Sequence, residues 1–479
     1  MSCPVKPVLC AFFAVVVSAV AETNGVDRKT QPPAAPLPAA TFPEFKETTL
    51  DNGLKVFLLE TDKQPTVSFR LVIKAGGALE GSKHGLAGMV AALLNKGTKN
   101  LSAEEFARQA DRLGISVEAA ASHDAVYISG TGLSKHAEEV LRFLSEAILH
   151  PLFPAEQLEK ERVKALSRIE AEKKEPAALA GKLRDQVVFG NHPYGAHATA
   201  DSIQKITRAD AVKFHKKYFV PNNASLAVVG EFDREKLLPK IKKTFGSWKR
   251  GKAPAVSPPS VKVEGVKIHL VDRPGSVQSN IIVAANGIPR NNHDTPELSV
   301  VNSVLGGGFS GRLFQNLRER NGFTYGSSSN FDQRKLGGVF SATAEVRNEV
   351  TGKAVIEILN ELKRIREEPI PEPELDLRKQ YVAGNYLLSL ESDRRNLERV
   401  QDIDLFGLPN DYYQTLVSRI REVDPNEAQS LARKYIPARD VAIIVVGDAD
   451  QIRPQLEPLG PVTVYDTDLK VKGQHNVDG

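Results

Sequence analysis

This sequence has few cysteines, few aromatic residues and a small net charge, and each of these features argues against a class of protein. Only 2 cysteines occur in 479 residues, which excludes a disulfide framework and a cysteine-rich metal site. Aromatic residues make up 6% of the chain and the formal net charge is +4. A base-stacking platform and a strongly basic surface, the usual signs of nucleic-acid binding, are therefore disfavoured.

Long apolar runs are also absent, apart from Val8 to Val20. Lys6 is the sole charged residue of the first 21, and the run ends in small residues before Ala21. This pattern predicts a secretory signal peptide over residues 1–21, with the mature chain starting at Glu22. A retained anchor is the alternative, but the run is shorter than the roughly 20 residues that a membrane span needs. We expect an exported protein, periplasmic if the source is Gram-negative, whose mature form has no cysteine.

The composition is that of a globular chain, with 41% hydrophobic and 25% charged residues. Two stretches rich in proline divide it, a leader over residues 22–42 and a linker over residues 251–262. We therefore predict domains over residues 43–250 and 263–463, followed by a loose polar tail over residues 464–479.

The two predicted domains resemble each other. Thr207 and Asp424 both read as N-caps, and each is followed by a helical pattern that ends at a tyrosine, a proline turn and an apolar strand that ends at a glycine. The paired residues Thr207 and Asp424, Tyr218 and Tyr435, and Gly230 and Gly447 are each 217 positions apart. Three matches at one offset predict a duplicated domain.

Strand patterns and amphipathic helices alternate within each half. Residues 56–59, 67–74, 268–271 and 280–285 read as strands, in pairs that look like hairpins. Ser102 to Glu105 reads as a capping box that opens a helix. We predict an α+β fold of two duplicated domains, each a largely antiparallel sheet covered on one face by helices.

Several motifs are similar to those of the pitrilysin/insulinase zinc peptidases, or inverzincins, which include mitochondrial processing peptidase subunits. They are Asp51 to Val56 followed by Lys74 to Glu80, which resembles the opening hairpin of that family, then Lys96-Gly97-Thr98, Phe153-Pro154 and His192 to Gly195. The resemblance extends from about residue 45 to about residue 462. It implies a proteolytic family with a zinc site on the His-x-x-Glu-His motif, in which two imidazoles hold the metal and a glutamate activates water.

The zinc motif is degenerate in this chain. His84 is kept, but Ala87 occupies the position of the general base and Gly88 that of the second ligand. The third ligand would be a glutamate seven residues after Glu161, and that position holds Arg168, which cannot coordinate a metal and would repel it. We expect no metal and no cofactor in this chain, with His84 a residual helix residue. His136 is expected on an exposed helix face, and His192 and His197 are expected to have surface or loop-packing roles.

A glycine-rich stretch in the second half carries a different signal. Gly306, Gly307 and Gly308 precede a helical pattern that stops at Asn321-Gly322, and a strand pattern begins near Phe323. On spacing alone this is a turn, a helix and a strand, and the absence of Gly-Lys-Ser/Thr argues against a phosphate loop. The family resemblance implies more, because Arg318 and Tyr325 match its Arg/Tyr pair in position and spacing. In that role Tyr325 would stabilise the oxyanion of the scissile carbonyl, Arg318 would bind the substrate backbone or orient Tyr325, and the glycines would contact substrate.

These observations favour the non-zinc subunit of a heterodimeric metalloendopeptidase, which completes the site of a homologous zinc-bearing partner that acts on unfolded peptides. The isolated chain is then expected to be inactive. The alternative is a non-catalytic peptide-binding or assembly scaffold of the same fold. A self-sufficient hydrolase is disfavoured, because the sequence has no Gly-x-Ser-x-Gly elbow and the mature chain has no thiol.

Overall fold

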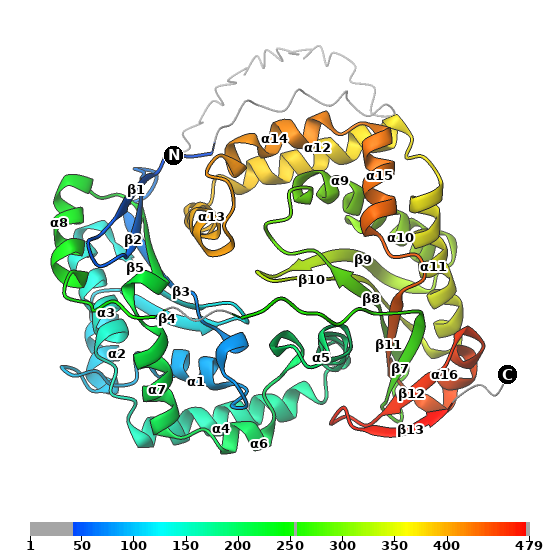
Figure 1. The fold of residues 1–479 in the computed structure, drawn as a ribbon, viewed down its shortest axis with the longest axis horizontal. Coiled ribbons are helices and arrows are strands. Elements are labelled where there is room, and N and C mark those ends of the chain that lie inside the picture. The colour runs from blue at the N-terminus through cyan, green and yellow to red at the C-terminus, as the bar shows by residue number, and fades with distance from the viewer. Residues whose placement is uncertain (1–41, 253–255, 476–479) are drawn as a thin grey trace, which may run out of the picture. The chain divides into compact units, whose positions relative to one another are not determined.

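The computed structural model describes residues 42–252 and 256–475, so the predicted signal segment lies outside the described residues, as does the predicted leader up to residue 41. Two sheets organise this part of the chain (Figure 1). The first has the strand order β1 (Lys46–Thr49), β2 (Lys55–Glu60), β6 (Ala224–Gly230), β3 (Thr66–Ile73), β5 (Val126–Leu133) and β4 (Ser116–Ala121). The second has the order β13 (Val471–His475), β12 (Val462–Tyr465), β7 (Val266–Asp272), β11 (Val441–Gly447), β8 (Gln278–Gly287), β10 (Gly338–Arg347) and β9 (Thr324–Gln333).

Helices accompany both sheets. Those of the first half are α1 (Leu86–Leu93), α2 (Ala103–Arg112), α3 (Ala137–Leu149), α4 (Ala155–Glu172), α5 (Pro176–Phe189), α6 (Ala200–Gln204), α7 (Arg208–Tyr218) and α8 (Arg234–Phe245). Those of the second are α9 (Thr295–Gly306), α10 (Arg312–Phe314), α11 (Thr351–Glu367), α12 (Glu372–Ser389), α13 (Asp393–Phe406), α14 (Tyr412–Glu422), α15 (Pro425–Tyr435) and α16 (Ala449–Leu456). Across the described ranges, none of these helices has the length and apolar character needed to cross a membrane.

The predicted α+β class is confirmed, since each sheet is mostly antiparallel and packs its core against helices of its own half. Strand β2 is parallel to β6, and β7 is parallel to β11. The pairs β3–β6, β3–β5 and β4–β5 are antiparallel, as are their counterparts β11–β8, β10–β8 and β10–β9. The order β2-β6-β3-β5-β4 therefore recurs as β7-β11-β8-β10-β9, which is the pattern that a duplicated domain leaves.

The offset of 217 found in the sequence extends over the second part of each half. Adding it to the bounds of α4, α5, α7 and β6 gives the bounds of α12, α13, α15 and β11. The predicted N-caps are also present: the Thr207 side chain accepts from Asp210 N, and the Asp424 side chain accepts from Asn426 N and Glu427 N. The capping box at Ser102 and Glu105 has both of its bonds.

Each half gives one helix to the sheet of the other half. Helix α5 packs on β8 and β11, so that Leu179, Leu183 and Phe189 share a core with Ile282 and Ile444. Its counterpart α13 packs on β6, β2 and β3, where Leu405 meets Val72. Helices α5 and α13 therefore cover part of the sheet faces that the helices of each half leave open (Figure 1).

Two sequence-based expectations were wrong. Strands β2 and β3 do not form a hairpin, because β6 lies between them, and β11 likewise separates β7 from β8. The residues beyond 463 are not all loose, since β12 ends at Tyr465 and Val471 to His475 form the edge strand β13. An edge strand is held by main-chain hydrogen bonds to its neighbour, so a polar segment can form one without an apolar pattern.

Candidate functional site

Arg318 and Tyr325 lie against each other in the second half. The guanidinium carbon of Arg318 is 4.7 Å from the centre of the Tyr325 ring and 5.0 Å from that of Phe314. Helix α10 continues into a π-helical turn from Gln315 to Arg320, and Gly322 then adopts a left-handed φ of 63°. This reversal leads directly into β9, which brings Tyr325 back beside Arg318.

The pair is presented to solvent. Tyr325 is 85% exposed, and the Arg318 side chain is 35% exposed with an ion-pair distance of 3.6 Å to Glu319. An arginine over an aromatic face is held by the ring quadrupole, which fixes the direction of both groups without occupying the tyrosine hydroxyl. The arrangement leaves a hydroxyl and guanidinium N–H donors available to a carbonyl oxygen.

Buried polar contacts hold the segment that carries Arg318. The Asn316 amide, which is buried, donates to Glu357 Oε2 at 2.9 Å and to Glu361 Oε1 at 2.8 Å. Asn321 Nδ2 donates back to Asn316 Oδ1 at 2.7 Å. Because π-helical turns are short and rarely stable alone, these bonds explain why the turn persists here.

In the glycine loop, residues 306–311, the structure explains why each of the first three positions is a glycine. A Cβ on Gly306 would lie 2.1 Å from Ser329 N, and one on Gly307 would lie 2.6 Å from Ser303 Cα. Gly308 has a φ of +73°, which favours glycine. Gly308 and Phe309 also line a groove of about 370 Å³ with Phe314 and residues of β9 and β10, next to Tyr325. The predicted contact of these glycines with substrate stays a prediction.

The positions that match the zinc motif form no comparable cluster. His84 lies in a turn before α1 and not on a helix, because the helix begins at Leu86 and its N-cap Gly85 has a φ of 96°. The expectation of a residual helix residue was wrong for this reason. Ala87 is buried, Gly88 has no atom within 4 Å of where its Cβ would be, and Arg168 is exposed on α4 at 3.6 Å from Glu172.

Glu80 is a residue of this region that sequence reasoning missed. Its carboxylate accepts from Gly85 N at 2.8 Å and from Ala87 N at 2.6 Å, so it caps the start of α1. Burial raises the pKa of Glu80 to about 7, although the two backbone donors act in the opposite direction. No local signal identifies this cap, because its partners stand five and seven positions further along the chain.

His192 and His197 have loop-packing roles, as expected. His192 caps a short 3₁₀ turn by accepting from Tyr194 N, and its Nε2 lies 2.9 Å from Ser257 O. His197 Nε2 lies 3.1 Å from Lys182 O, and burial lowers the pKa of His197. Within residues 42–252 and 256–475, no group of three or more His, Cys, Asp or Glu side chains is arranged to hold a metal ion.

Family comparisons match both halves of the chain. Residues 55–202 match the model described as insulinase (peptidase family M16), and residues 205–382 match the model described as peptidase M16 inactive domain. The chain belongs to peptidase family M16. The predicted resemblance is thereby confirmed, and residues 205–382 are a domain of the type that the family describes as inactive.

Relatives of similar length carry differing names. A Bacillus subtilis protein called uncharacterized zinc protease YmxG is 24% identical over 409 residues, which cover 84% of this chain and 98% of that one. A Helicobacter pylori protein called non-peptidase homolog YmxG is 25% identical and covers 80% of this chain and 89% of its own. The solved peptidase M16 inactive domain from Pseudomonas fluorescens superposes with a TM-score of 0.79 at 26% identity, over 84% of this chain and 98% of that structure.

Proposed function

We propose that this M16 chain is the non-zinc subunit of a heterodimeric metalloendopeptidase. The observation that carries the proposal is the exposed Arg318–Tyr325 pair, held at 4.7 Å between guanidinium and ring, in a chain whose zinc-motif positions are occupied by Ala87, Gly88 and Arg168. A homologous partner with the full His-x-x-Glu-His motif would hold zinc and activate water. This chain would add the donors that stabilise the oxyanion.

The chemistry of the pair fits that task. As the carbonyl of the scissile peptide becomes tetrahedral, negative charge develops on its oxygen, and a fixed hydroxyl or guanidinium donor lowers the barrier. The donors must point the right way beforehand, which is what the π-helical turn and the buried Asn316 contacts supply. The zinc ion of the partner would supply the metal-bound nucleophile.

Unfolded peptides are the proposed substrates. Strands β9 and β4 are edge strands of their sheets, and an exposed edge can pair with an extended peptide by main-chain hydrogen bonds. Tyr325 is the second residue of β9, so a peptide held along that edge would pass the oxyanion donors. An exported, periplasmic protein of this kind would meet unfolded secreted chains.

The test mixes the mature protein with a homologous subunit that carries the complete zinc motif. We expect a complex on gel filtration and cleavage of an unfolded fluorogenic peptide by the mixture. Tyr325→Phe should reduce kcat by roughly 10²–10³ with little change in KM, because one oxyanion donor is lost. Arg318→Ala should change both parameters, since Arg318 is assigned to the substrate backbone as well.

Tyr435→Phe is the control, because it deletes a tyrosine hydroxyl at the end of α15, which donates to Asp294 and lies away from the glycine loop. We expect its kcat to stay near that of the unsubstituted complex. If Tyr325→Phe also pairs and cleaves at the unsubstituted rate, the oxyanion role is wrong. The chain would then be the alternative, a peptide-binding or assembly scaffold of the same fold.

A further inference from the structure

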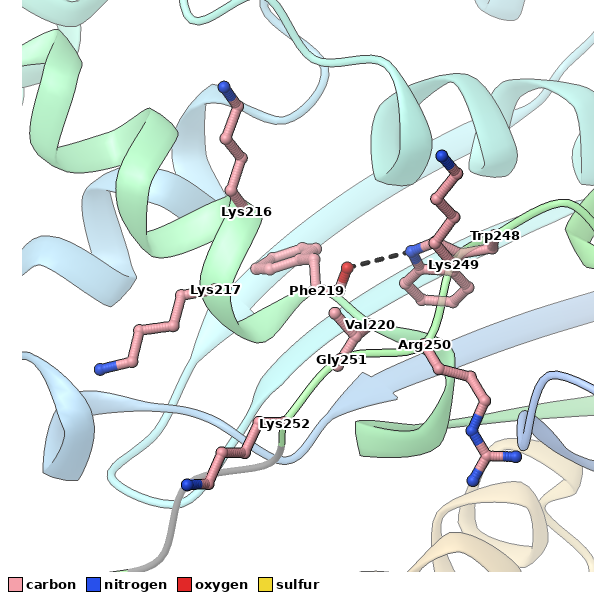
Figure 2. Close-up of a pocket in the computed structure, with 9 residues that line it drawn as sticks. All are labelled: Lys216, Lys217, Phe219, Val220, Trp248, Lys249, Arg250, Gly251 and Lys252. Atoms are coloured by element: carbon pink, nitrogen blue, oxygen red, sulfur yellow. Dashed lines mark hydrogen bonds between the residues drawn. The ribbon is translucent and has the colours of Figure 1, made fainter.

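A groove far along the sequence from the Arg318–Tyr325 pair has a cationic rim and an apolar floor. It has a volume of about 710 Å³ and is formed by the end of α7 with the residues that follow it, and by the segment after α8 (Figure 2). The residues that line it are Lys216, Lys217, Phe219, Val220, Trp248, Lys249, Arg250, Gly251 and Lys252. We call it the basic groove.

The wall of the basic groove is held rigidly by side-chain bonds to the backbone. Trp248 Nε1 donates to Phe219 O at 3.0 Å, which ties the second segment to the first (Figure 2). The Asn222 amide donates to Gly251 O at 2.8 Å and accepts from Gly251 N at 2.9 Å. Asn52 Nδ2 donates to Trp248 O at 3.2 Å. A site fixed in this way loses little conformational freedom when a ligand binds.

The five cationic side chains have no acidic partners in the described part of the chain. Lys216, Lys217, Lys249, Arg250 and Lys252 are all exposed, and the ion pairs of residues 42–252 and 256–475 include none of them. Figure 2 shows their charged ends spread around the floor. In a chain with a net charge of only +4, such a concentration of one sign creates a local positive potential that an anion would relieve.

The apolar floor of the basic groove favours an anion that also carries hydrocarbon. Phe219 and Val220 are 3% and 7% exposed, and the half-buried Trp248 spends its N–H on Phe219 O, so the indole offers the groove an apolar ring. A single-stranded nucleic acid needs a succession of exposed rings for its bases, which the groove lacks. An amphiphile with a phosphate next to hydrocarbon fits both parts, since tryptophan and basic side chains together favour the interface of a bilayer.

We propose that the basic groove docks the protein onto a bilayer surface that contains anionic phospholipid. The rim cations contact lipid phosphates, and a lipid headgroup that enters the groove places its glycerol carbons against the exposed part of the Trp248 ring. The mode is peripheral attachment, which needs no membrane-spanning helix. It is independent of the proposed peptidase role, because none of the residues involved belongs to the Arg318–Tyr325 site.

The test uses the full mature chain and vesicles of phosphatidylcholine with or without phosphatidylglycerol. Trp248 is the sole tryptophan, so its fluorescence reports on the basic groove alone. We expect co-sedimentation and a blue shift of emission with the anionic vesicles and neither with neutral vesicles, and we expect added salt to weaken binding. Lys216→Gln combined with Lys249→Gln should lower the partition coefficient roughly 25-fold, at about fivefold for each charge near the surface.

The matched control is Lys353→Gln with Lys363→Gln, which removes the same charge from exposed positions of α11. It should bind vesicles nearly as the unsubstituted chain does. Two further arms use inorganic phosphate and polyglutamate as probes. The proposal is overturned if the groove variant binds vesicles as tightly as the control, if Trp248 emission does not shift, or if polyglutamate shifts it while anionic vesicles do not. Displacement of vesicles by millimolar phosphate would also overturn it, since the site would then hold a free anion.

Discussion

At Glu80, burial and hydrogen bonding act in opposite directions on one carboxyl group. Burial favours the neutral form, and the N–H groups of Gly85 and Ala87 favour the charged form. Burial has the larger effect, so the folded protein holds this proton up to about pH 7, well above the ordinary value of 4.5. The start of α1, where the family places its zinc motif, is therefore sensitive to pH.

The first prediction compares the protein with Glu80→Gln across pH. Between pH 4.5 and 7 the folded state binds a proton that the unfolded state releases, so stability from this group is full below pH 4.5 and is lost as pH rises through 7. The unsubstituted protein should lose up to roughly 3 kcal/mol relative to the variant over that interval. Urea unfolding of both proteins at pH 5, 6, 7 and 8 measures the difference. Parallel stability curves would show that Glu80 keeps its ordinary pKa.

The second prediction tests the close packing of α9 against β9 at the glycine loop. Helix α9 ends against β9, where a Cβ on Gly306 would lie 2.1 Å from Ser329 N. Gly306→Ala should therefore force the loop off the strand and destabilise the protein by about 1–3 kcal/mol, as overpacking does. Gly88→Ala is the control, because its Cβ would meet nothing within 4 Å on a helix, and it should stabilise by about 0.5–1 kcal/mol. Thermal unfolding of the two variants should shift in opposite directions, and equal shifts would refute the packing argument.

Helix α13 of the second half is held to the sheet of the first half by ion pairs as well as by apolar contact. Asp404, whose side chain is 4% exposed, lies 2.9 Å from Lys55 Nζ and 2.7 Å from Lys74 Nζ. Asp404→Asn keeps the shape and removes the charge, which leaves two ammonium groups facing each other. Breaking a fully buried ion pair costs about 3–5 kcal/mol. Lys55 and Lys74 are 41% and 22% exposed, so solvent screens their charges, and we expect a smaller destabilisation of roughly 2 kcal/mol.

Lys63→Ala is the matched control for Asp404→Asn. Its pair with Glu391 also joins the two halves, but the two side chains are 49% and 80% exposed. A pair in solvent contributes under about 1 kcal/mol. Urea unfolding of both variants gives the comparison, and an equal effect would mean that burial of the Asp404 cluster adds nothing.

The sequence predicted which segments form helices and strands better than it predicted which elements pack against each other. The caps at Ser102 and Thr207 were predictable because a cap is a local bond over three residues. The insertion of β6 between β2 and β3 was not, because strand order depends on pairing between residues about 170 positions apart. Helix α5 has the apolar residues Leu179, Leu183 and Phe189, but nothing in the sequence indicates that Ile282 and Ile444 of the other half cover them.

The residues of the candidate site could be named from the sequence, but the contacts that bring them together depend on the fold. Arg318 and Tyr325 were identified by their match to a family pattern, and the structure adds the π-helical turn that brings them together. The basic groove combines Lys216 and Lys249, which stand on separate segments joined only in the fold. Glu80 was missed because its partners are backbone N–H groups, which every residue but proline carries.

At the scale of the whole molecule, duplication has left two halves with the same framework and different chemistry. The offset of 217 is kept from α4 to β6, so the frameworks have stayed in register. In the first half, Ala87, Gly88 and Arg168 stand at the positions that match the zinc motif, whereas the second half carries Arg318 beside the exposed Tyr325. Under the proposed function, this preserved framework is what lets the chain fit a homologous partner.

The last prediction is that the isolated chain binds no stoichiometric zinc. A protein zinc site takes three or four His, Cys, Asp or Glu ligands, and His84 alone can supply one. Ala87 and Gly88 have no donor atom, and His84 precedes the helix start by two residues, so its imidazole is not placed on the helix face that the motif requires. The Arg168 guanidinium adds a positive charge on α4. Metal analysis of the purified chain after dialysis should find far less than one zinc per chain, with the zinc-bearing homologue as the positive control. One zinc per chain that survives dialysis would mean that His84 has ligand partners outside the aligned positions.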